Sequence, residues 1–172
     1  MKNYFIIFLC FFAFANAQKK TTHKSYSTVL KQITPNSNPE YWAIHYVEDT
    51  ANTKILETGS PKKLESTKNG FLRNDKDKSY YYIVTVNKGK TEYITTNDGL
   101  KNFVGKLNNG EEAIIQAILN GYYLDFDFTE IAANYTQDNK NYYLNIGKKI
   151  SERCPLSRAH YYLTIDKTTG AI

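Results

Sequence analysis

Residues 97–121, NDGLKNFVGKLNNGEEAIIQAILNG, carry the helical signal that decides the fold class of this chain. In the first part of this stretch, apolar side chains recur at i, i+3, i+4 and i+7, the spacing of one face of a helix. These residues are Leu100, Phe103, Val104 and Leu107. Thr96 or Asn97 can accept a hydrogen bond from the first turn, as N-cap residues do. The spacing therefore predicts a short helix with one buried face.

A second helix is expected over residues 110–119. Asn109, with Glu112 three positions later, makes a variant of the capping box in which Asn replaces Ser or Thr. The charges of Glu111 and Glu112 also suit the positive end of a helix dipole. Asn120-Gly121 offers a left-handed stop after the helix. The buried face is predicted to contain Ile114, Ile115 and Ile118.

Strand signals lie on both sides of the two helices. Runs rich in β-branched and aromatic residues favour strands, and fifteen tyrosines and nine phenylalanines strengthen this signal. We expect strands at residues 41–47, 80–86, 90–95, 142–150 and 160–166. The order strands, helices, strands predicts an α+β fold, an antiparallel sheet with two short helices packed on one face.

The first seventeen residues have the pattern of a cleaved signal peptide. Lys2 gives a positive start, residues 4–14 are almost entirely apolar, and Ala15-Asn16-Ala17 fits the cleavage motif. The apolar run is well short of the roughly 20 residues that span a bilayer. We therefore expect cleavage after Ala17 and a secreted or periplasmic protein without a membrane span.

The remaining chain is the size of one domain. Residues 18–40 are polar and are expected to form a mobile leader that contains His23. Residues 41–172 are expected to form a single α+β domain. Within it, residues 59–78 carry the weakest structural signal, because prolines, glycines and mixed charges outnumber apolar residues there.

Charge and cysteine content exclude several classes of function. The net charge of +5 is spread along the chain, and its densest basic cluster, residues 18–24, lies near a terminus. Nucleic-acid binding would need a basic stripe in the folded part. Cys10 leaves with the signal peptide, so Cys154 is the only remaining thiol and no internal disulfide is expected. No phosphate loop, dinucleotide fingerprint or other cofactor motif is present.

Tyrosines in the predicted strands give the strongest candidate for a binding surface. They occur in adjacent runs, and side chains alternate across a strand, so each run must place a ring on each face. The outward rings, assigned to Tyr81, Tyr143 and Tyr162, would form an aromatic platform for a peptide, a sugar or a partner protein. The alternative is a second face that is merely rich in tyrosine.

Two groups of residues allow an enzymatic alternative. Cys154 and His160 could pair as thiol and imidazole, although no acid is obviously placed to orient the histidine. Asp125 and Asp127 would share one face of a strand, where with Glu130 they could hold a hard cation or serve a hydrolase. The simpler interpretations are a buried cysteine and a solvated acidic face.

No metal site is expected from the histidines. His23, His45 and His160 are far apart in the sequence and have no zinc-ligand spacing.

The ending YYLTIDKTTGAI, residues 161–172, resembles the closing hairpin of PepSY-type domains and the end of small NTF2-like immunity proteins. Residues 97–172 also look like small exported bacterial proteins in which Glu-Glu-Ala, here residues 111–113, precedes Gly-Tyr, here residues 121–122. The PepSY resemblance implies a non-catalytic domain that binds or restrains an exported partner. We therefore expect an exported, non-enzymatic domain that binds a protein or a small ligand. The alternatives are a secreted hydrolase or an immunity-type inhibitor with a cognate toxin.

Overall fold

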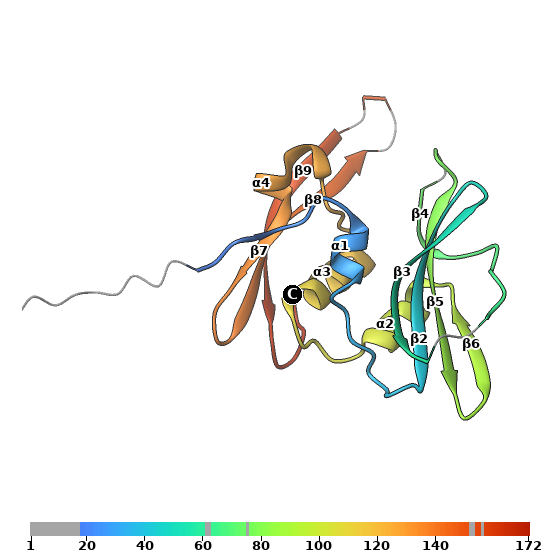
Figure 1. The fold of residues 1–172 in the computed structure, drawn as a ribbon. Helices are drawn as coiled ribbons and strands as arrows, with labels where there is room; N and C mark the ends of the chain where they lie inside the picture. Colours follow the sequence, from blue (N-terminus) through green and yellow to red (C-terminus); the bar gives the residue numbers. More distant parts are fainter. Residues whose placement is uncertain (1–17, 61–62, 75, 152–153, 156) are drawn as a thin grey trace, which may run out of the picture.

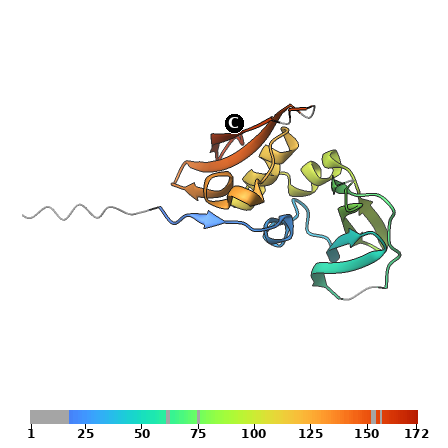
Figure 2. The same cartoon turned by 90° about the horizontal axis from the view of Figure 1, so that it is seen from above.

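Two antiparallel sheets enclose a layer of short helices (Figures 1 and 2). The computed structural model describes residues 18–60, 63–74, 76–151, 154–155 and 157–172. The predicted α+β class is confirmed. The strands form two sheets instead of one, so the helices lie between sheets and contact both.

The first sheet has five strands in the order β3-β2-β5-β4, with β6 also paired to β5. Its members are β2 (Tyr41–Glu48), β3 (Ala51–Gly59), β4 (Phe71–Asn74), β5 (Ser79–Asn87) and β6 (Lys90–Ile94). Strand β2 is covered on both faces: Trp42 packs toward the helices, whereas Tyr41 packs on the opposite side. This double coverage explains why the strand is apolar along most of its length.

The second sheet has four strands in the order β1-β7-β8-β9. Its members are β1 (Thr21–Thr22), β7 (Ala133–Gln137), β8 (Asn141–Ser151) and β9 (Ser157–Asp166). The predicted pairing of the last two strands is confirmed, with Leu144 opposite Leu163. Strand β9 therefore forms one edge of this sheet.

The two predicted helices are present as α2 (Asn97–Val104) and α3 (Gly110–Leu119). The Gly99 N–H donates to Thr96 Oγ1 at 3.1 Å, and the Glu112 N–H donates to Asn109 Oδ1 at 2.9 Å. Both predicted caps are therefore formed. Three shorter elements were not predicted: α1 (Tyr26–Leu30), η1 (Phe126–Phe128) and α4 (Thr129–Ala132).

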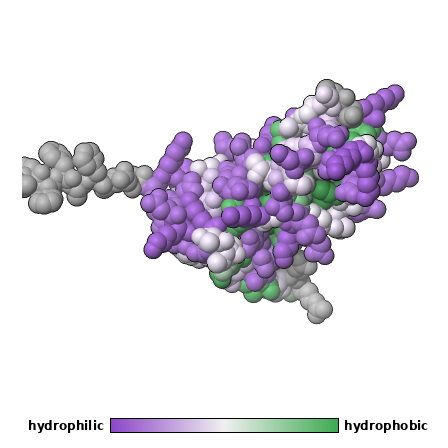
Figure 3. Space-filling view, turned by 90° about the horizontal axis from the view of Figure 1, so that it is seen from below, coloured by the Kyte–Doolittle hydropathy of each residue, from purple (hydrophilic) through white to green (hydrophobic). Residues whose placement is uncertain are grey.

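A single apolar core joins the two sheets, and α3 lies within it. Ile114 and Ile115 belong to the same buried cluster as Ile83 of the first sheet and Leu144 of the second. The large apolar side chains are thus concentrated between the sheets, and the molecular face in Figure 3 is mostly hydrophilic, with only small separate hydrophobic patches. Burial of this cluster is the main source of stability in a chain with no disulfide among its described residues.

The N-terminal segment is part of this core, which corrects the prediction of a mobile leader. Strand β1 pairs with β7, and the His23 N–H donates to Ala133 O at 2.9 Å. The apolar side chains of α1 and the following turn are almost fully enclosed: Val29, Leu30 and Ile33. Three buried side chains and a few strand hydrogen bonds are enough to hold a segment that is otherwise polar.

A buried carboxylate ties this segment to α3. Glu112 is 0 % exposed, and its Oε1 accepts hydrogen bonds from the Thr34 N–H at 2.8 Å and the Thr34 hydroxyl at 2.5 Å. Its Oε2 accepts from the Asn108 N–H at 2.5 Å. In a capping box this side chain would return to the N-cap residue, Asn109. Here it bonds to the residue before the cap and to a segment far away in the sequence.

The segment between β3 and β5, predicted to be the least structured, covers the far face of the first sheet. Leu64 packs on the buried cluster of Tyr41 and Val84, and the Tyr80 hydroxyl donates to Thr67 O at 2.8 Å. Phe71 is 2 % exposed and lies in the main core as part of β4. A few anchored residues thus fix a polar loop.

None of the helices within the described ranges is both long and apolar enough to cross a membrane. The predicted signal peptide, residues 1–17, lies outside the described residues.

Leu30→Ala tests whether the N-terminal segment stabilises the fold. Removing this fully buried side chain should lower the free energy of unfolding by about 2–5 kcal/mol, because a cavity remains in the core. Lys31→Ala, at the neighbouring exposed position, should change it by less than about 0.5 kcal/mol. Urea denaturation followed by circular dichroism measures both values. Equal, small effects would contradict the docking of this segment.

Candidate functional site

The candidate site lies on the face of the second sheet that points away from α3, here called the outer face. Along β8 and β9, side chains alternate between the core and this face. Leu144 and Ile146 of β8, with Leu163 and Ile165 of β9, are buried in the core. By alternation, the outer face carries Tyr143, Asn145 and Gly147 of β8 and Arg158, His160, Tyr162 and Thr164 of β9.

Two of the predicted site residues meet on the outer face. The rings of Tyr143 and Tyr162 stack with centroids 5.9 Å apart and planes inclined by 11°. Tyr162 is 62 % exposed, so one face of the stack is open to solvent. The Tyr143 hydroxyl donates to Asp138 Oδ2 at 2.7 Å, and this hydrogen bond raises the pKa of Tyr143. The structure therefore brings together two of the three tyrosines and fixes one of them.

Tyr81 is not part of this surface, so its assignment as an outward ring is wrong. It lies in β5 of the other sheet, is 7 % exposed, and its hydroxyl lies 3.0 Å from Ser27 Oγ. Alternation does place Tyr81 and Tyr82 on opposite faces of β5. Both faces are covered, however, because Tyr82 is only 1 % exposed.

A cluster of charged side chains occupies the other end of the outer face. The Asp125 side chain is 2 % exposed, and its Oδ2 lies 3.0 Å from Arg158 Nη1 and 3.1 Å from His160 Nε2. The Tyr123 hydroxyl donates to the same oxygen at 3.3 Å. Arg158 Nη1 also donates to Asp127 Oδ2 at 3.3 Å. We call these five residues the Asp125 cluster.

The backbone around Asp125 forms a turn, so the two aspartates do not share one face of an extended strand, as they would if this stretch were a strand. Asp125 Oδ1 accepts from the Asp127 N–H at 3.3 Å, and its carbonyl accepts from the Phe128 N–H at 3.0 Å. Aspartate side chains often cap their own backbone in this way. As a result the side chain of Asp125 is buried, whereas that of Asp127 is 78 % exposed. Glu130 lies apart from them and pairs with Lys20.

Arg158 is the functional candidate that the sequence analysis missed. Its guanidinium lies 4.8 Å from the Phe128 ring centroid, and its hydrogen bond to Asp127 is the main cause that raises the pKa of Arg158. The signal was present in the order Arg158-Ala159-His160, because residues two apart on a strand share a face. Its partner, Asp125, could not be found from spacing alone.

The Asp125 cluster supplies part of a catalytic arrangement. Contrary to expectation, an acid does orient His160, whose side chain is 27 % exposed. A buried carboxylate bonded to one imidazole nitrogen leaves the other available as a base. Nucleophilic catalysis would also need a nucleophile beside that nitrogen. Cys154 is exposed, not buried as the simpler interpretation held, and among the described contacts none joins it to His160.

Within the part of the chain that the structure describes, no group of three or more His, Cys, Asp and Glu side chains could hold a metal ion. His45 lies in the first sheet, stacked on Tyr82 with ring centroids 4.7 Å apart.

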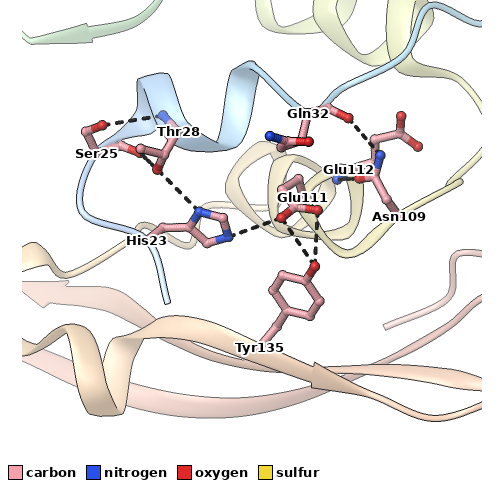
Figure 4. A network of polar contacts seen from close by, with 8 residues as sticks. All are labelled: His23, Ser25, Thr28, Gln32, Asn109, Glu111, Glu112 and Tyr135. Atoms are coloured by element: carbon pink, nitrogen blue, oxygen red, sulfur yellow. Dashed lines mark hydrogen bonds and ion pairs between the residues drawn. The ribbon is translucent and has the colours of Figure 1, made fainter. Parts of the chain in front are cut away.

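A separate buried network surrounds His23 (Figure 4). His23 is 4 % exposed; its Nδ1 lies 3.3 Å from Thr28 Oγ1 and its Nε2 lies 3.5 Å from Glu111 Oε1. The Thr28 hydroxyl donates its proton to Ser25 O at 2.7 Å, so it can only accept from His23. The contact between them therefore needs a proton on His23 Nδ1. The Tyr135 hydroxyl donates to Glu111 at 3.2 Å. The Tyr135–Glu111 hydrogen bond thus joins β7 to α3, and the His23 ring packs beside it, stacked on Tyr135.

Burial sets the protonation of this network. It lowers the pKa of His23, and the Glu111 carboxylate opposes this shift only in part. Burial, with a smaller contribution from Glu111, also raises the pKa of Tyr135 to about 12. His23 is accordingly neutral in the folded protein at pH 7, with Nε2 lacking a hydrogen-bond partner.

This assignment predicts how stability depends on pH. A histidine titrates near pH 6.5 in the unfolded chain and at a lower pH in the folded protein, so the unfolded state gains the proton first as pH falls. The free energy of unfolding should therefore decrease as the pH falls below about 7. His23→Gln should reduce this slope, as measured by urea denaturation across the range. An unchanged slope would show that His23 is not held neutral by burial.

Alkylation of Cys154 tests the thiol–imidazole alternative. The exposed thiol should react with iodoacetamide in the native protein, at the same rate in the wild type and in His160→Gln. A catalytic pair would instead lose about tenfold or more of its reactivity when the base is removed. Mass spectrometry of the time course measures the rate, and denatured protein gives the reference for an unhindered thiol.

Comparison with protein-family models, with curated proteins and with solved structures gave no match.

Proposed function

We propose that this chain is an exported, non-enzymatic domain that binds a partner protein through the outer face of β8 and β9. The observation that carries the proposal is the Tyr143–Tyr162 stack, of which Tyr162 is 62 % exposed. Exposed aromatic side chains on soluble proteins are concentrated at interaction sites, where they supply a large contact area at little entropic cost.

The residues around the Tyr143–Tyr162 stack are suited to binding the surface of a partner protein. Tyr143 is already held by Asp138, so little side-chain freedom is lost when a partner packs on the pair. Asn145 lies directly opposite Tyr162 across the two strands, and Thr164 lies opposite Tyr143. These polar side chains can form hydrogen bonds around an aromatic centre, which is the usual anatomy of an interface.

Two features of the sequence support the cellular context of this proposal. The pattern of residues 1–17 favours export, and the resemblance of residues 161–172 to PepSY-type endings implies a domain that binds or restrains an exported protein. An immunity-type inhibitor would be a special case, in which the partner is a toxin.

A secreted hydrolase is the second candidate, because Asp125 orients His160 at the surface. The pair supplies a base and its orienting group. The contacts of Arg158 with Asp125, Asp127 and Phe128 also give the cluster a structural role, since they hold η1 against β9. We favour binding, because the described contacts of His160 include no nucleophile.

Capture experiments with single substitutions test the binding proposal. Proteins retained by the mature chain from the medium and envelope fraction of its source should be lost with Tyr162→Ala, with affinity falling on the order of tenfold or more. Tyr93→Ala is the matched control, because Tyr93 is an exposed tyrosine of the other sheet, at 39 %. Quantitative mass spectrometry compares the three samples. Equal recovery with Tyr162→Ala and wild type would rule out this face as the binding site.

A further inference from the structure

The outer edge of β9 is an unpaired sheet edge. Among the described strands, in the order β1-β7-β8-β9, this strand pairs only with β8. An edge strand presents a row of backbone N–H and C=O groups that another strand can bind. This edge is a different surface from the outer face, since it is formed by the backbone.

The hydrogen-bond pattern shows which residues point toward the open edge. The N–H and C=O of Gly147 both bond to Tyr123, on the side away from β9. Its partner across the strands, His160, therefore belongs to a non-hydrogen-bonded pair and directs its backbone groups away from β8. Because this direction alternates along a strand, the same holds for Arg158, Tyr162 and Thr164.

The unpaired stretch of the β9 edge ends at Asp166, two residues after Thr164. The Asp166 N–H donates to Ala171 O at 3.0 Å, and Asp166 O accepts from the Gly170 N–H at 2.8 Å. The C-terminal turn thus satisfies the outward groups of Asp166. Within the described residues, no such bonds are made by the outward groups from Arg158 to Thr164.

Between Arg158 and Asp166, the sequence of β9 lacks the features that normally protect an edge. Residues 159–165, AHYYLTI, contain no proline, glycine, lysine or acid and consist mostly of strong strand formers. The other described edges differ: β3 carries the Lys54–Glu57 ion pair and β6 carries Lys90–Glu92, whereas β1 has only two residues and β4 only four. Of the described edges, β9 is thus the one suited to pairing.

We propose that β9 pairs with β9 of a second copy of this chain, in antiparallel orientation. The pairing places Arg158 opposite Thr164 of the second copy and His160 opposite Tyr162. This register matches all four outward residues of each strand, and any shift leaves at least one of them unpaired. It also places no like charges opposite each other.

The side-chain pairs of this register are favourable. A His–Tyr pair directly across two strands already occurs in the chain, where His45 faces Tyr82 with stacked rings 4.7 Å apart. On the core side, Tyr161 would meet its own copy on the two-fold axis, and it is 37 % exposed in one chain. Closing the edge would join the two outer faces into one continuous surface. The inference goes beyond the proposed function and does not depend on it.

Oligomeric state tests this inference with a substitution at the edge. The mature chain should be a dimer in sedimentation velocity, and Thr164→Pro should be a monomer, since proline removes an N–H that only the second copy uses. Because β8 does not use that N–H, Thr164→Pro should still fold, with a circular dichroism spectrum close to that of the wild-type chain. Thr164→Val, which keeps the N–H, should remain dimeric. A monomeric wild type, or a dimeric Thr164→Pro, would overturn the proposal.

Cross-linking gives a second measurement that does not depend on how Thr164→Pro folds. In a Cys154→Ser background, Tyr161→Cys should oxidise to a disulfide-linked dimer, because Cα atoms of a non-hydrogen-bonded pair are about 4.5 Å apart, within disulfide range. Tyr93→Cys in the same background should not cross-link. Failure of Tyr161→Cys to cross-link would exclude the proposed register. Loss of capture by Tyr162→Ala with an intact dimer would separate the binding face from the edge.

Discussion

The arrangement of the molecule depends on the hydrogen bonds that the buried carboxylate of Glu112 accepts. This carboxylate accepts hydrogen bonds from Thr34 and Asn108, so one charge joins the N-terminal segment, the loop before α3 and the helix itself. A charge that is 0 % exposed costs several kcal/mol if its partners leave. Because α3 packs on β7 and β8 of the second sheet and against α2, which contacts β4 and β6 of the first, the two helices together fix how the sheets are placed.

Much of the fold could be predicted because its elements have strong local patterns. Helix α3 begins after Asn109 and ends before Gly121, as its cap and stop residues indicate. The division of the strands into two sheets could not be predicted, since it depends on which strands meet in space. The turn at Asp125 was missed for a different reason. Its alternating residues satisfy a strand pattern, but the aspartate side chain bonds to its own backbone instead.

The candidate site shows the same division between local and tertiary information. Alternation correctly placed Tyr143 and Tyr162 away from the core, and strand pairing then brought them together. The same rule failed for Tyr81, because it gives the face of a strand and not whether that face is covered. The partnership of Asp125 with Arg158 depends on η1 lying against β9, which no spacing in the sequence indicates.

The pairing of β1 with β7 has a consequence for the order of folding. Thr21 meets Tyr135, and the adjacent contact of Lys20 with Glu130 spans 110 positions of the chain. Contacts between residues so distant in sequence form late, because closing a long loop costs entropy before any stabilisation is gained. During synthesis, which starts at the N-terminus, residues 21–22 therefore have no strand partner until β7, residues 133–137, has been made.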